Sequence, residues 1–98
     1  MGEALRDLSV VYAKHSDPER RDPAMAIRLA ERSNVLSAGR SPSVLDALAM
    51  AYASAGRFDD AVDTASRAVE LARASGYDSL ASNIEARLLV YRRRAPSP

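Results

Sequence analysis

The chain has 98 residues, a formal net charge of +1 and no cysteine, and these totals exclude several classes of protein. A charge so close to zero gives no general attraction to nucleic acid or to an anionic membrane. The lack of cysteine excludes disulfides and thiolate metal sites, and no apolar run approaches the length of a membrane span. We therefore expect a soluble, cytoplasmic domain without metal or cofactor that does not bind nucleic acid or membrane.

The composition predicts an all-α fold. Alanine supplies nineteen residues and the aromatic residues only five, so the core must be thin and closely packed. Ala, Leu, Arg and Glu are strong helix formers, and β-branched residues never alternate over the length of a strand. Thirteen of the fourteen basic residues are arginine, which indicates a GC-rich, bacterial genome rather than a set of phosphate contacts.

Five helices are predicted in chain order, and the first two have clear boundaries. The first covers about residues 3–15. The second covers about residues 23–36, because Asp22 is a good N-cap and Pro23 is well suited to the first helical position. Gly39 follows this helix and can take the left-handed conformation that closes it.

The third and fourth helices have similar signals. Ser41 and Pro42 repeat the pair of cap and proline, and Gly56 closes the helix that they open. The fourth helix has Asp59 or Asp60 at its start, where a carboxylate faces unpaired amides and the positive end of the helix dipole.

The fifth helix follows a glycine turn. The fourth helix runs to about Ser75 and ends at Gly76. Asp78 or Ser79 is expected to cap the fifth, which continues to about Arg93. Residues 95–98 are expected to form a flexible tail.

Parts of the sequence repeat, with two different offsets. The first set shares an offset of forty positions and comprises Leu5, Leu8, Ser9, Tyr12 and Ala13, which recur as Leu45, Leu48, Ala49, Tyr52 and Ala53. The second set shares an offset of thirty-five and comprises Ala26, Ile27, Ala30, Ser33 and Leu36, which recur as Ala61, Val62, Ala65, Ala68 and Leu71. The difference of five between the two offsets predicts a five-residue insertion within residues 15–22. Repeats of this length indicate a stacked array of helix pairs.

The second copy resembles the tetratricopeptide repeat (TPR) family. The matching positions are Leu45, Leu48, Ala49, Tyr52, Gly56, Phe58, Ala61, Ala68 and Leu71. The resemblance implies one domain over residues 1–94, a right-handed α-solenoid with repeats at about 3–36 and 42–75 and a capping helix at about 78–93. Two positions depart from the family: Ala65 replaces a frequent aromatic residue, and Arg73 replaces the closing proline, so the fourth helix can continue to Gly76.

The two ends of the predicted array differ. The fifth helix has one apolar stripe, formed by Leu80, Ile84, Leu88 and Tyr91, and a polar opposite side, as the end of an array requires. The first helix has no equivalent cover, because Leu8, Val10 and Val11 spread over more than one face. A preceding repeat or a second copy of the chain could cover Leu8 and Val11, which makes homodimerisation one possibility; simple exposure of the valines is the other.

No catalytic motif is present. His15 is followed by Ser16 and Asp17, but neighbours at a helix end do not generally point at one another, and a triad needs a base held by a third group. The acidic residues near them lack the spacing of a calcium loop. We therefore predict no enzyme activity and no catalytic residue.

The predicted function is a protein–protein interaction module. The resemblance implies a groove lined by the first helix of each pair, into which a peptide or partner helix can lie. The predicted groove residues are Arg6, Val10, Lys14, Asp46, Ala47, Met50, Ser54 and Ser82. Asp78 disfavours the carboxylate clamp of chaperone-binding family members, because it would repel a C-terminal carboxylate. The alternative is a self-associating structural element, or the C-terminal segment of a larger protein.

Overall fold

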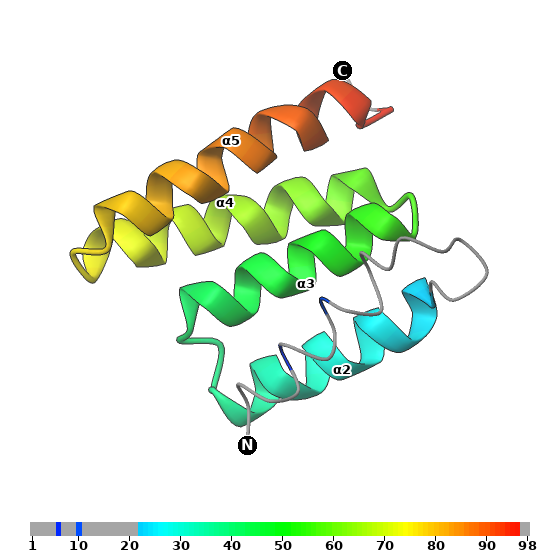
Figure 1. Cartoon of the computed structure of the whole chain (residues 1–98), viewed down its shortest axis with the longest axis horizontal. Coiled ribbons are helices and arrows are strands. Elements are labelled where there is room, and N and C mark those ends of the chain that lie inside the picture. Colours follow the sequence, from blue (N-terminus) through cyan, green and yellow to red (C-terminus); the bar gives the residue numbers. More distant parts are fainter. Residues whose placement is uncertain (1–5, 7–9, 11–21, 97–98) are drawn as a thin grey trace.

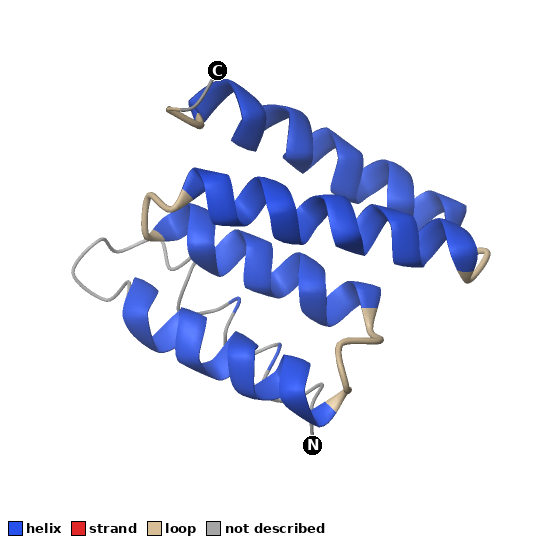
Figure 2. Cartoon of the chain, turned by 180° about the vertical axis from the view of Figure 1, so that it is seen from behind, coloured by secondary structure: helices blue, strands red, loops and turns tan. Residues whose placement is uncertain are grey.

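The computed structural model describes Arg6, Val10 and residues 22–96, and this part of the chain consists of helices and short turns. The continuous helices are α2 (Pro23–Leu36), α3 (Pro42–Ser54), α4 (Phe58–Ala74) and α5 (Asp78–Arg94). Figure 1 shows them side by side in chain order, and Figure 2 shows the same row from behind. Each packs mainly against the next one in the sequence. The all-α prediction is confirmed for the described residues.

The predicted first helix falls largely outside the described residues. Only Arg6 and Val10 of that segment are described, and both are helical. The insertion predicted within residues 15–22 likewise lies outside the described part, except for Asp22.

Helices α2 and α3 begin with the same arrangement of cap and proline. The Asp22 carboxylate accepts a hydrogen bond from the Met25 backbone N–H at 3.0 Å, and the Ser41 hydroxyl accepts one from the Val44 N–H at 3.3 Å. A proline follows each cap, where its missing N–H leaves no hydrogen bond unmade. Both predicted helix starts are confirmed.

Helices α4 and α5 begin without a side-chain cap. Arg57 precedes α4, and the two predicted aspartates lie within its first turn. Tyr77 precedes α5, so the prediction that Asp78 or Ser79 is the cap is wrong. The reason is the short preceding turn, which brings Asp78 into the helix itself. Its carboxylate lies in the first turn, near the positive end of the dipole.

The turns after α3 and α4 have the same hydrogen bonds. The Arg57 N–H donates to the Tyr52 carbonyl at 2.9 Å, and the Tyr77 N–H donates to the Ala72 carbonyl at 2.8 Å. Each bond spans five residues around a left-handed glycine with a φ of +77° or +81°. This is the Schellman ending of a helix, which needs one residue with positive φ.

Helix α2 ends with this pattern too, but alanine takes the place of the glycine. The Gly39 N–H donates to the Asn34 carbonyl at 2.9 Å, which puts Ala38 at the left-handed position, with a φ of +56°. Gly39 does have a positive φ, as predicted, but it is the second such residue of the turn. A side chain at positive φ costs about 1–2 kcal/mol, so this turn is strained.

We predict that Ala38→Gly stabilises the protein by about 0.5–1 kcal/mol, because glycine removes the strain but enlarges the freedom of the unfolded chain. The measurement is the free energy of unfolding in urea. Ala55→Gly is the matched control, since Ala55 follows α3 with an ordinary φ of −90°. It should lower the stability. Equal effects of the two substitutions would contradict the strain at Ala38.

Alanine forms most of the helix contacts. At three of the five pairs of positions related by thirty-five residues, both copies are fully buried. These positions are Ala26, Ala30 and Ser33 in α2 and Ala61, Ala65 and Ala68 in α4. Small side chains let helix backbones approach closely, and the core is correspondingly thin. Helix α4 ends at Ala74, so it continues past Arg73 as expected.

The core has two clusters, and α3 contributes to both. Leu45 and Ala49 pack against α4 and α5, whereas Leu48 and Ala51 pack against α2. Tyr52 is half-buried and contacts both clusters. In α5 the predicted stripe is buried apart from its first residue, Leu80, which is half-buried.

We predict that Ala49→Leu lowers the stability by about 1–3 kcal/mol, because Ala49 is fully buried and a larger side chain would overpack the contact with α4. Thermal unfolding followed by circular dichroism measures the loss. Ala86→Leu, on the exposed side of α5, should have little effect. An unchanged melting temperature for Ala49→Leu would contradict the tight packing at this position.

Candidate functional site

Helices α3 and α5 both contact α4 and are also joined directly by an ion pair. Arg87 of α5 donates from Nε to Asp46 Oδ1 at 3.0 Å and from Nη2 to Asp46 Oδ2 at 2.6 Å. The Asp46 side chain is only 10% exposed and that of Arg87 33%. Paired, nearly parallel bonds of this kind fix direction as well as distance. The pair therefore helps to fix how α5 faces α3.

The surface around this pair contains two hollows. The first, of about 300 Å³, is lined by Arg6, Val10, Ser43, Asp46, Ala47 and Met50. The second, of about 380 Å³, is lined by Met50, Ala53, Ser54, Phe58, Arg87, Val90, Tyr91 and Arg94. Met50 belongs to both, and each member of the ion pair belongs to one. Together the two hollows form the surface that we call the α3–α5 groove.

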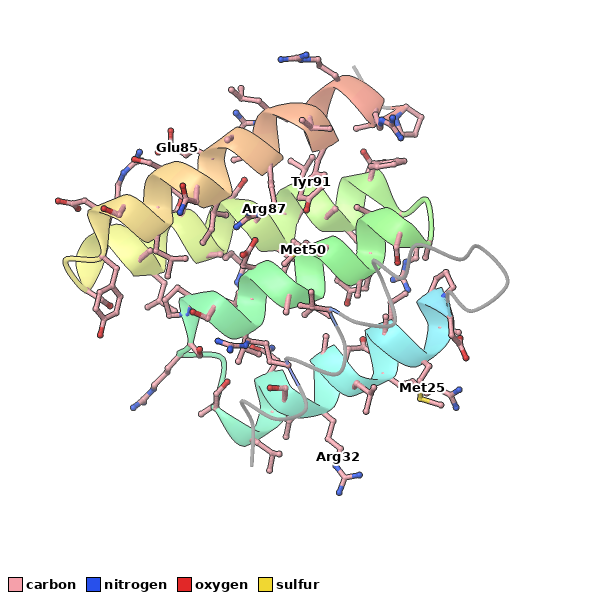
Figure 3. All side chains as sticks on the ribbon, in the orientation of Figure 1. Met25, Arg32, Met50, Glu85, Arg87 and Tyr91 are labelled. Carbon is pink, nitrogen blue, oxygen red and sulfur yellow. The ribbon has the colours of Figure 1, made fainter. Side chains whose placement is uncertain are left out.

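Figure 3 shows the centre of this groove. Met50 extends from α3, and Arg87 and Tyr91 extend from α5, all in the space between the two helices. Glu85 lies on the other side of α5, and Met25 lies at the outer side of α2. The helical repeat explains the α5 wall, because positions 87, 90, 91 and 94 share one face at intervals of three and four residues.

The structure brings most of the sequence-predicted groove residues to this surface. Arg6, Val10, Asp46 and Ala47 line the first hollow, Ser54 lines the second, and Met50 lines both. Asp46 and Ala47 are largely buried at its base, and the Asp46 carboxylate is occupied by Arg87.

The remaining predicted residues are not part of the groove as described. Ser82 is exposed on α5 and lines neither hollow. Lys14, and the two residues predicted for self-association, Leu8 and Val11, lie outside the described residues.

Sequence reasoning missed the α5 wall and part of the floor. Phe58 was predicted only as a position of the repeat and Tyr91 only as part of the core stripe, and Arg87 was not singled out. Val90 and Arg94 received no role in the groove. The available signal was the spacing of 87, 90 or 91, and 94 along one face, next to the core stripe.

One tyrosine at the floor of the groove, Tyr91, has a strongly raised pKa. Burial raises the pKa of the Tyr91 phenol to about 12, from an ordinary value of 10.0. The Asp46 carboxylate is the second, smaller cause of this rise, and the Arg87 guanidinium opposes it. Tyr91 is neutral near pH 7, and its largely buried phenol ring lies at the base of the second hollow.

A second tyrosine, Tyr52, connects the other side of α3 to α2. The Tyr52 hydroxyl donates to Glu31 Oε2 of α2 at 3.3 Å, and Arg57 lies 4.5 Å above the centre of its ring. Burial raises the pKa of Tyr52, and the Glu31 carboxylate adds to the rise. These contacts tie α2 to α3 away from the groove.

A larger hollow, of about 760 Å³, lies where the turns before α3 and α5 come together. Its lining includes Arg40, Ser75, Gly76, Tyr77 and Asp78, all of them exposed. Half of its lining residues belong to turns and the rest to the first turns of α3 and α5, so it is an open depression between helix ends. The α3–α5 groove has the more apolar and better-defined floor.

The described residues contain no group of three or more His, Cys, Asp or Glu side chains that could hold a metal ion. None of the helices in this part of the chain is long and apolar enough to cross a membrane. Comparisons with protein-family models, with curated proteins and with solved structures gave no match to this chain.

We predict that Arg87→Ala destabilises the protein by about 1–3 kcal/mol, because it leaves the Asp46 carboxylate buried without a partner. The matched control is Arg73→Ala. Arg73 of α4 pairs with Glu85 of α5, but those side chains are 57% and 40% exposed, so its loss should cost less than about 1 kcal/mol. Urea unfolding measures both. An Arg87→Ala variant as stable as Arg73→Ala would contradict a structural role for the buried pair.

Proposed function

We propose that the chain is a non-enzymatic protein-interaction module that binds a peptide or a partner helix in the α3–α5 groove. The observation that carries this proposal is the pair of hollows joined at Met50. An interaction module needs a surface that is apolar, accessible and bounded by polar groups, and the groove combines all three.

We further propose that the architecture is a right-handed TPR-like solenoid of five helices. Two observations support it. Three pairs of positions thirty-five residues apart in α2 and α4 are fully buried in both helices, and the turns after α3 and α4 have the same hydrogen bonds. Such agreement at a fixed interval is what a stacked array of similar units produces. In that arrangement α3 and α5 would be the groove-lining helices of successive units.

The groove also has apolar residues that can contact a side chain of a bound peptide. Val90 is 46% exposed on one wall, and Met50 is half-buried on the other. Methionine is flexible and polarizable, so it adapts to side chains of different shape. Phe58 and Tyr91 add aromatic surface at the base. The apolar area thus lies between two helices rather than on an isolated ridge.

The test uses a display library of random twelve-residue peptides, selected on the immobilised protein. We expect selected peptides to bind Met50→Glu at least tenfold more weakly than the unaltered protein, because the new carboxylate lies where both hollows meet. Fluorescence anisotropy titrations measure the dissociation constants. Met25→Glu is the matched control, since Met25 lies at the outer side of α2 (Figure 3), and it should bind normally.

A second variant separates binding from folding. Val90→Glu changes the opposite wall at an exposed position, so it should weaken binding while circular dichroism and melting temperature stay unchanged. Peptides that bind both groove variants as tightly as the unaltered protein would overturn the proposal. So would a library that yields no peptide.

A further inference from the structure

The second hollow of the groove has charged side chains of only one sign. Its lining includes two arginines, Arg87 and Arg94, and no carboxylate. The other six lining residues are uncharged. A hollow with an apolar floor and cationic walls attracts a ligand group that carries negative charge beside an apolar one.

The two arginines differ in what they already bind. Arg87 directs two of its nitrogens to Asp46, so its charge is compensated within the protein. Among the described residues, no carboxylate lies within 4.0 Å of Arg94. Its guanidinium instead lies 5.9 Å from the centre of the Phe58 ring. That contact holds the guanidinium at the hollow and leaves its N–H donors available to a ligand.

The helix dipole does not account for this placement. Arg92, Arg93 and Arg94 all occupy the last turn of α5, where a positive charge is favourable. Any of the three satisfies that preference, but only Arg94 lines the second hollow and lies against Phe58. Arg93 therefore has the same charge and helical position without the groove contact.

We propose, on the basis of the groove function above, that the partner is a peptide segment that carries an apolar side chain and, a short distance from it, the side-chain carboxylate of an aspartate or glutamate. The apolar side chain occupies the hollow between Met50 and Val90. The side-chain carboxylate binds the Arg94 guanidinium at the open end, in charge-assisted hydrogen bonds. Arg94 lies four residues after Val90, about 6 Å along the axis of α5. The carboxylate and the anchor are therefore about one helical turn apart.

The experiment compares two display libraries of twelve residues, one containing all twenty amino acids and the other lacking aspartate and glutamate. We expect the first library to yield the tighter peptides. For its best peptides, Arg94→Gln should weaken binding about three- to tenfold, and Arg93→Gln, which removes the same charge, should not. Replacing the acidic residue of the peptide by its amide should cause the same loss. With both changes made together, the losses should not add, because they remove one interaction.

Each outcome separates this inference from the groove function. Peptides from the acid-free library that bind as tightly, and lose binding with Met50→Glu, would leave the groove function standing and overturn the role of Arg94. Equal losses for Arg94→Gln and Arg93→Gln would also overturn it, because they would indicate general attraction to the basic end of α5. Failure of both libraries to yield peptides would instead overturn the groove function.

Discussion

Close contact between helices through alanine is the constraint on which the rest of this structure depends. Ala61, Ala65 and Ala68 are fully buried along one side of α4 and let its neighbours approach. Each such contact buries little apolar area, so stability depends on close fit over the length of the helices. The short distances also have a geometric consequence. Helices α3 and α5, both held against α4, come near enough for Arg87 to reach Asp46. Phe58 and Tyr91 line the second hollow and form the floor of the groove.

The buried ion pair connects this packing to the groove. Desolvation of two charges is costly, and well-packed apolar side chains of similar size are often as stabilising. The pair contributes a defined orientation of the two side chains, because two hydrogen bonds between a planar guanidinium and a carboxylate fix how these groups face each other. With Arg87 held in this way, Val90, Tyr91 and Arg94 follow on the same face of α5. The ion pair thus adds to the packing of α5 against α4 in fixing the α5 wall of the groove.

The sequence predicted the local features of the fold well and the long-range ones only in part. Caps at Asp22 and Ser41 and glycine turns depend on a few neighbouring residues, so their signals can be read directly. The left-handed conformation of Ala38 was not predicted, because the adjacent Gly39 adopts that conformation more easily. The hydrogen bond from the Gly39 N–H to the Asn34 carbonyl places Ala38 at the left-handed position of the turn. Asp46 and Arg87 are forty-one positions apart, and each alone reads as an ordinary polar residue. Their pairing depends on the rotation of α5, which tertiary packing determines. For the same reason the predicted residues of α3 line the groove, whereas Ser82, the residue predicted for α5, lines neither hollow.

An apolar groove that no side chain fills lowers the stability of the fold, and other side chains at its walls could fill it. A larger or branched side chain at Ala53 or Met50 would fill part of the second hollow and bury Val90, which would gain stability from the apolar area removed from water. The groove instead has a small residue and a flexible one on α3, opposite an exposed valine. Single exposed apolar residues are common in proteins and need no explanation. Here, however, they lie together between two helices held at fixed orientation by a costly ion pair. Helices held at a fixed orientation and a flexible methionine preserve the space for another side chain, and this combination favours binding over self-contained packing.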